Sequence, residues 1–208
     1  THIIDSKMAN VSEAYYWRAW NYHARKDLVA ARRDIDSAKA LASSGTIFTL
    51  AGVIEHDQDD LVIADRDLRA AVAAAYGGRN CTAAWYLGLV SMKREQWLES
   101  SQWFETSMSC YEQNVAESEA GLRSMALRTD IDPEFRARQV AGFEAALKED
   151  RGQYYAAAFN AANQGARAGR IDRARELLEI AAKDPALDIL VQQLRQIIKR
   201  PETARHGP

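Results

Sequence analysis

The side chains best suited to acid–base chemistry or metal binding in this sequence are two histidines and an aspartate. His23 and His56 lie 33 residues apart, and Asp57 adjoins His56. A metal site or a general base is conceivable here, but the pair lacks the i, i+4 spacing that puts two ligands on one helix face. We therefore interpret His23, His56 and Asp57 as groove or helix-end residues and expect no metal.

No other motif points to catalysis. The sequence contains no glycine-rich phosphate loop, no nucleophile elbow and no His-Glu-x-x-His run. Acidic pairs such as Glu117 and Glu119 are typical of solvated helix ends. We expect a protein that is not an enzyme, with no catalytic residue and no cofactor.

The composition favours helices along the whole chain. The 208 residues include 11 Gly and 4 Pro, and no proline precedes Pro133. An all-β fold needs a turn residue roughly every 8 to 12 positions, so the small number of Gly and Pro residues argues against that fold. A net charge of −2 argues against a nucleic-acid partner. No apolar run approaches the roughly 20 residues of a membrane-spanning segment.

A helical stripe of alternating large and small residues occurs four times. Its members recur at intervals of three and four, which places them on one helix face. The stripes are Leu28-x-x-Ala31-x-x-x-Ile35-x-x-Ala38, Leu61-x-x-Ala64-x-x-x-Leu68-x-x-Ala71, Trp97-x-x-Ser100-x-x-x-Phe104-x-x-Ser107 and Ile171-x-x-Ala174-x-x-x-Leu178-x-x-Ala181. The first small residues of successive stripes are 33, 36 and 74 positions apart (Ala31, Ala64, Ser100, Ala174). Because 74 is twice 37, we expect one degenerate repeat before the last stripe.

Another helix precedes each stripe by about a dozen residues. These helices carry an Ala or Gly where two helices would cross closely (Ala19, Gly52, Gly88 and Ala162). Short polar connections, such as 25–27 and 93–95, join the two helices into a hairpin.

The hairpins resemble tetratricopeptide repeats (TPRs), whose pattern is aromatic-x-x-Leu-Gly-x-x-Tyr, then Ala-x-x-x-Phe, then Pro. Leu87-Gly88 matches it in the third hairpin, and Ala174 with Pro185 matches it in the last, whereas Ala84 replaces the opening aromatic. The resemblance implies an all-α fold, an α-solenoid of antiparallel helix hairpins in a right-handed superhelix. We expect a single domain over 1–199, with repeats at 12–44, 45–78, 81–113, 115–149 and 152–185, a cap helix at 186–199 and a disordered tail at 200–208. The count is then eleven helices.

In TPR proteins the first helix of each hairpin lines a concave groove, and the resemblance assigns the corresponding residues here to partner binding. Aromatic and methionine side chains among a few polar groups are typical of interface cores. The resemblance therefore implies a scaffold that binds a protein or peptide, although the aromatic rings could instead pack between repeats. The assigned residues are Tyr16, Trp20, His23, Val53, His56, Asp57, Trp85, Leu89, Met92, Lys93, Phe159, Asn163 and Arg167.

The two cysteines lie at the two ends of the third hairpin. Cys81 opens its first helix and Cys110 closes its second, and these ends adjoin in an antiparallel hairpin, so a disulfide could form. The alternative is two unrelated buried thiols. A bridge would indicate a periplasmic or secreted protein, and free thiols a cytoplasmic one. The chain begins with Thr1 and not with Met, so a removed signal peptide is neither shown nor excluded.

Two other functions stay open from the sequence. The chain could be a structural subunit that associates with itself as a homo-oligomer, for example in an assembly of the cell envelope. A small-ligand or metal-dependent activity near His23, His56 and Asp57 is less favoured.

Overall fold

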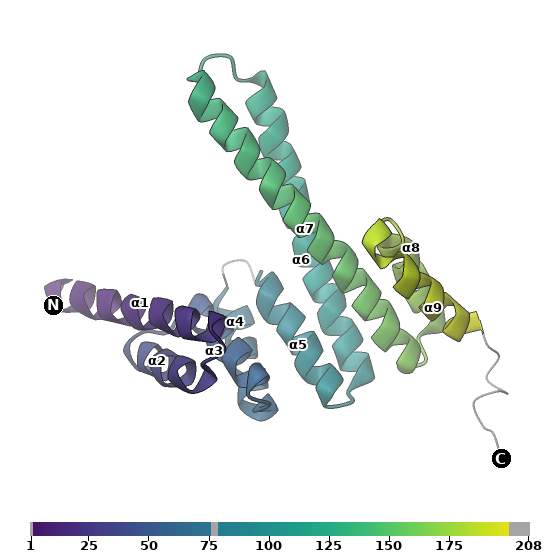
Figure 1. Cartoon of the computed structure of the whole chain (residues 1–208), viewed down its shortest axis with the longest axis horizontal. Coiled ribbons are helices and arrows are strands. Elements are labelled where there is room, and N and C mark those ends of the chain that lie inside the picture. The colour runs from purple at the N-terminus through teal and green to yellow at the C-terminus, as the bar shows by residue number, and fades with distance from the viewer. Residues whose placement is uncertain (1, 76–78, 200–208) are drawn as a thin grey trace. The chain divides into compact units, whose positions relative to one another are not determined.

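The computed structural model describes residues 2–75 and 79–199, with the side chains of 11–75 and 79–199. The predicted tail, 200–208, lies outside the described residues. Within them the elements are α1 (His2–Ala24), α2 (Leu28–Leu41), α3 (Gly45–Asp57), α4 (Leu61–Ala74), α5 (Cys81–Lys93), α6 (Trp97–Leu127), α7 (Pro133–Arg167), α8 (Ile171–Ala181), the 3₁₀ helix η2 (Pro185–Leu187) and α9 (Asp188–Lys199) (Figure 1). The predicted all-α class is thus confirmed. The chain forms two compact units, Thr1–Gln96 and Trp97–Pro208, where the sequence predicted one domain.

The N-terminal unit is a stack of helix hairpins. Helices α1 to α5 each pack against the next, and the first helices of successive hairpins, α1, α3 and α5, also contact one another. The small residues of the repeated stripe, Ala31 and Ala64, are fully buried. A Cβ on Gly52 would lie 2.4 Å from Cγ of Leu68, so the predicted close crossing of α3 and α4 is confirmed.

The same turn recurs at the ends of four helices, α1, α3, α5 and α7. Its last residue has a positive φ, between 58° and 80°, and the next N–H donates to the carbonyl oxygen five residues back, as in a Schellman motif. The positive-φ residues are Lys26, Asp59, Glu95 and Gly169. They follow at steps of 33, 36 and 74 residues, the steps of the helical stripe, so the turns confirm the repeat register. Four such turns occur in the described residues, where the five predicted repeats would need five.

The C-terminal unit contains α6 to α9. Helices α6, α7 and α8 pack in sequence, and α9 contacts α7 and α8. Ser101 on α6 donates a hydrogen bond to the carbonyl oxygen of Ala161 on α7 at 2.9 Å. Ala157, Ala158 and Ala162 on α7 are fully buried, because small side chains let α7 approach its neighbours closely.

The predicted fourth repeat is wrong. Helix α6 runs through 113–115 and α7 runs through 149–152, so both predicted breaks are absent. No Gly or Pro stands at the first junction, and the one glycine at the second, Gly152, costs a helix only about 1 kcal/mol. Residues 115–149 instead extend α6 and α7 into a long two-helix arm, in which the helices run side by side to its tip (Figure 1). We call this segment the arm.

A narrow seam holds the arm together. Residues at 114, 118, 121 and 125 of α6, and at 140, 143, 147 and 150 of α7, are at least half-buried, with the mean spacing of 3.5 that is typical of coiled coils. The ring of Phe143 packs closely on Gly121, because a Cβ added to this glycine would lie 2.5 Å from the ring. Asn114 Nδ2 donates to Asp150 Oδ1 at 3.3 Å, which gives the seam one polar layer.

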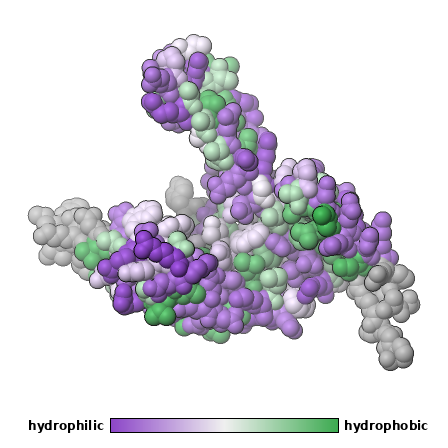
Figure 2. All heavy atoms as spheres, viewed as in Figure 1, coloured by the Kyte–Doolittle hydropathy of each residue, from purple (hydrophilic) through white to green (hydrophobic). Residues whose placement is uncertain are grey.

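The C-terminal cap is α9, preceded by η2. Val191, Leu194 and Ile198 are buried, whereas Ile189, Leu190 and Ile197 are exposed. The apolar side chains of α9 are therefore only partly covered, and Figure 2 shows hydrophobic surface over the C-terminal helices. No helix within 2–75 and 79–199 combines the length and apolarity needed to span a bilayer.

Candidate functional site

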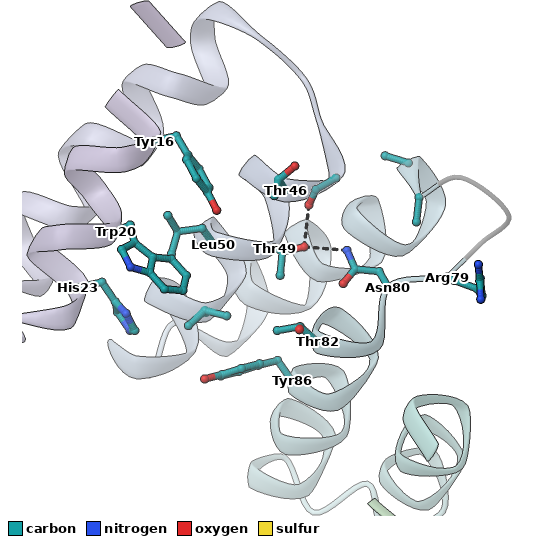
Figure 3. Close-up of a pocket in the computed structure, with 14 residues that line it drawn as sticks. Tyr16, Trp20, His23, Thr46, Thr49, Leu50, Arg79, Asn80, Thr82 and Tyr86 are labelled. Carbon is teal, nitrogen blue, oxygen red and sulfur yellow. Dashed lines mark hydrogen bonds between the residues drawn. The ribbon is translucent and has the colours of Figure 1, made fainter. Parts of the chain in front are cut away.

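A groove of about 640 Å³ runs along the first helices of the N-terminal hairpins. Side chains from α1, α3 and α5 line it, and all of its lining residues belong to the N-terminal unit (Figure 3). They are Tyr16, Trp20, His23, Gly45, Thr46, Thr49, Leu50, Val53, Ala74, Ala75, Arg79, Asn80, Thr82 and Tyr86.

One half of the groove is aromatic. Tyr16 and Trp20 stand one helical turn apart on α1, beside Leu50 of α3, and Tyr86 of α5 lies on the opposite wall (Figure 3). The opposite side of α1 supplies the core, where Ala19 is fully buried against α2 and α3. That leaves Tyr16, Trp20 and His23, at positions i, i+4 and i+7, on the groove side. Trp20 is 50% exposed.

The hydroxyl groups of this aromatic half stay protonated at neutral pH. Burial raises the pKa of Tyr16 above its usual value of 10.0. Burial also raises the pKa of Tyr86, and the nearby negative charge of Asp57 raises it further. Both tyrosines can therefore donate hydrogen bonds into the groove.

The other half is polar, and its central side chains bond to one another. Asn80 caps α5, because its Oδ1 accepts a hydrogen bond from the N–H of Ala83 at 3.0 Å. Its Nδ2 donates to Oγ1 of Thr49 at 2.8 Å, and Thr49 donates to the carbonyl oxygen of Gly45 at 2.6 Å (Figure 3). This chain of bonds fixes the start of α5 against α3.

One carboxylate joins the two histidines singled out from the sequence. Asp57 accepts hydrogen bonds from His23 Nε2 at 2.9 Å and from His56 Nδ1 at 3.1 Å. Burial raises the pKa of Asp57, but the bonds from the two imidazoles outweigh it and the pKa lies below 3.8. An ionised carboxylate only accepts, so both rings must hold a proton on the bonded nitrogen. The His56 ring also meets Tyr86 edge to face, with centroids 5.3 Å apart.

This cluster orients side chains through its hydrogen bonds. Both oxygens of Asp57 are taken by the imidazoles, and Lys26 Nζ lies 3.9 Å from Oδ2. Among the described residues, no three His, Cys, Asp or Glu side chains gather closely enough to hold a metal ion. The cluster therefore fixes His23 at the groove and supports Tyr86 through His56.

Four of the residues assigned from the TPR resemblance line the groove: Tyr16, Trp20, His23 and Val53. His56 and Asp57 adjoin it through the contacts just described. Lys93 lies at the end of α5 and donates to Asp59 Oδ1 at 2.9 Å and to the carbonyl oxygen of His56 at 3.3 Å.

On α5 the groove is lined one position further along than the assigned Trp85. Tyr86 lines the groove, whereas Trp85, Leu89 and Met92 do not. Successive helix residues are about 100° apart, so Trp85 faces another side of α5 when Tyr86 faces the groove. Equal steps of 33 residues, from Thr49 to Thr82 and from Val53 to Tyr86, are the signal that could have identified them.

The remaining assigned residues belong to the C-terminal unit and take no part in this groove. Phe159 and Asn163 are half-buried on α7. Arg167 is exposed, and its guanidinium group lies over the ring of Trp97, 4.9 Å from the centroid. Cys81 begins α5 and Cys110 lies on α6, and both are in disulfide form.

Among the solved structures that resemble this chain, two have low sequence identity to it. YrrB, described as a TPR protein with an unusual peptide-binding site, is 20% identical, with a TM-score of 0.44 over 88% of this chain and 90% of that one. PilF of Pseudomonas aeruginosa is 15% identical, with a TM-score of 0.47 over 93% of this chain and 86% of that one. No protein-family model matches the chain, and no curated protein matches it in sequence. At these scores neither structure says what this chain binds.

Proposed function

We propose that the N-terminal unit binds an extended peptide segment of another protein in the α1/α3/α5 groove. The observation that supports this best is that one groove is lined from rigid helix positions by the half-exposed ring of Trp20 and by the partly buried rings of Tyr16 and Tyr86. Aromatic side chains of this kind dominate the binding energy of protein interfaces.

Binding is a better account of the groove than catalysis. No Ser, Cys, Asp or Glu side chain lines it, so the described residues supply no pairing of a strong nucleophile with a base. His23 is the one imidazole in the lining, and its Nε2 is held by Asp57. The groove therefore offers shape, ring surface and hydrogen-bond donors.

The test is Trp20→Ala, with Trp17→Ala as its matched control. Trp17 lies on the same helix and is 53% exposed, but does not line the groove. Each variant is screened against an array of random decapeptides, and helix content is compared by circular dichroism. We expect Trp20→Ala to lose the peptides that the unchanged protein and Trp17→Ala retain, at equal helicity. An array with no bound peptide, or binding that Trp20→Ala leaves intact, would refute the proposal.

We also propose that the protein works in an oxidising compartment, the periplasm or the cell exterior. The disulfide form of Cys81 and Cys110 supports this, because such bonds persist outside the cytosol. Fractionation of the source cells, followed by thiol labelling of the protein in each fraction, tests it. Recovery of the protein in the cytosol with two reactive thiols would contradict it.

A further inference from the structure

A second groove, of about 510 Å³, runs along one side of the arm. All of its lining residues lie on α6 and α7, between positions 114 and 150. In the C-terminal unit, α8 and α9 lie beside the opposite end of α7, away from the tip of the arm (Figure 1). No residue of α8 or α9 lines the groove, so neither helix covers this side of the arm. We call it the arm groove.

The floor of the arm groove contains a glycine that no contact among the described residues requires. Gly142 is exposed, and a Cβ added to it would have no atom within 4 Å. Gly121 of the same arm differs, because the ring of Phe143 lies 2.5 Å from where its Cβ would be. A glycine inside a helix is less favourable than an alanine. The missing side chain at Gly142 leaves room at the surface, where another helix can approach the backbone of α7 closely.

Apolar side chains border this open floor. Phe143 and Ala146 line the arm groove and are half-buried. Phe135 is 46% exposed and precedes Gly142 by seven residues, about two helical turns, so it lies on the same side of α7. Exposed apolar surface beside a groove is a feature of sites that contact another molecule.

Opposite charges stand at the two ends of the arm groove. Arg138 lies at the end nearer the tip, and Asp150 lies at the other end, about 18 Å further along α7. Glu117 of α6 is near Asp150 along the arm, because Asn114 Nδ2 bonds to Asp150 Oδ1 and Glu117 follows Asn114 by one helical turn. Within one copy, Arg138 lies 3.7 Å from Glu134 in an exposed pair, which contributes little.

This pattern of charges matches itself when a second arm runs in the opposite direction. The midpoint between Arg138 and Asp150 falls between Gly142 and Ala146, in the middle of the floor. A twofold axis at this point places Arg138 of each copy beside the acidic end of the other, and it brings the two open floors together. Two arms that ran in the same direction would instead place like charges side by side, which disfavours pairing.

We propose that the arm groove is a contact between two copies of the chain, whose arms pair antiparallel about this axis as a four-helix bundle. Four helices enclose a core more completely than two, and the ring of Phe143 lies at the edge of that core. Because two arms of this length offer less area than the roughly 800 Å² per partner of a standard interface, we expect a dissociation constant in the micromolar range. This inference does not depend on the α1/α3/α5 groove or its proposed peptide.

Sedimentation equilibrium of the full chain, from about 1 to about 500 µM, measures the association. We expect the average mass to rise from that of one chain towards that of two. Gly142→Leu should weaken the dimer by at least about tenfold, because its side chain fills the floor while its Cβ meets no atom of its own copy within 4 Å. Gly152→Leu is the matched control, since Gly152 is also on α7 with nothing within 4 Å of its Cβ but does not line the arm groove. The control should leave the dissociation constant unchanged, and circular dichroism should show equal helix content in all three proteins.

An exchange of charges tests the antiparallel arrangement. Arg138→Glu and Glu117→Arg should each weaken the association by at least about tenfold, because each places like charges together at both contacts of the twofold pair. An equimolar mixture of the two variants should regain the dimer. In the mixed pair one contact keeps the original charges and the other carries them in reverse, so opposite charges face each other at both.

A mass of one chain at every concentration would overturn the inference, and the arm groove would then be left for a different protein. A dimer that Gly142→Leu leaves intact, or that Gly152→Leu weakens equally, would place the contact elsewhere and overturn it too. If each charge variant is monomeric and their mixture stays so, the antiparallel pairing is wrong.

Discussion

Glu55 of α3 should make the N-terminal unit less stable as the pH rises towards 8. Its side chain is fully buried, and neither oxygen accepts a hydrogen bond within the described residues. Arg32 Nη2 and Lys39 Nζ lie 3.4 and 3.7 Å from Oε1, but Lys39 also pairs with the buried Asp67. Burial first, and then the charge of Asp67, raise the pKa of Glu55 to about 7.

The sign follows from comparing this value with the ordinary 4.5 of an unfolded glutamate. Below pH 4.5 both states are protonated, so Glu55 costs nothing. Between 4.5 and about 7 the unfolded chain releases the proton while the folded chain keeps it, so stability falls with rising pH. At about 1.4 kcal/mol for each pH unit, the full loss is about 3 kcal/mol. Asp67 has a lowered pKa, so its contribution is lost only at more acidic pH, outside this window.

Glu55→Gln keeps the shape and removes the ionisation. We expect the variant to match the unchanged protein at about pH 4, below both pKa values, and to exceed it in free energy of unfolding by up to about 3 kcal/mol at pH 8. Urea unfolding followed by circular dichroism measures this, and amide hydrogen exchange of α3 reports the N-terminal unit separately. Glu95→Gln, an exposed change in the same unit, is the control. A difference between Glu55→Gln and the unchanged protein that stays constant from pH 5 to 8 would refute the reasoning.

Three further predictions concern backbone fit and the cysteines. Gly52→Ala should destabilise the protein by about 1 to 3 kcal/mol, because its Cβ would overlap Leu68. Gly152→Ala should stabilise it by about 1 kcal/mol, because nothing lies within 4 Å of its Cβ. Equal urea midpoints for the two variants would contradict this. Glu95→Gly should raise the stability by up to about 1 kcal/mol and Gly169→Ala should lower it, since both residues have positive φ, and the same measurement tests the pair. Thiol titration in denaturant should find no free thiol before reduction and two after it, and a digest should yield one peptide pair that joins Cys81 to Cys110.

Much of the fold follows from local patterns in the sequence. The stripe that contains Ala31 and Ala64, and the close approach at Gly52, depend on helix periodicity, which is visible in the sequence. The arm could not be predicted in the same way. The expected breaks near 114 and 150 came from assuming a constant repeat length, whereas nothing in the local chemistry there ends a helix.

Only those site residues that share one face of a single helix could be predicted together from the sequence. Tyr16, Trp20 and His23 share one face of α1 at i, i+4 and i+7, so finding one of them implies the others. On α5 a shift of one position separates Trp85 from Tyr86, and which of them faces α3 depends on how the hairpins pack. The bond from His23 to Asp57 joins residues 34 positions apart, a contact that no local pattern contains.

The length of the arm does not depend on how the helices of the repeat hairpins pack. Its two helices extend together beyond the repeat body, so removing one heptad from each would shorten it by about 10 Å and keep the seam in register. Removing a heptad from one helix alone would leave the seven residues opposite it, on the other helix, without a partner in the seam. The segment therefore has the properties of a spacer, whose reach can change in fixed increments while the turns at Glu95 and Gly169, and everything packed around them, stay as they are.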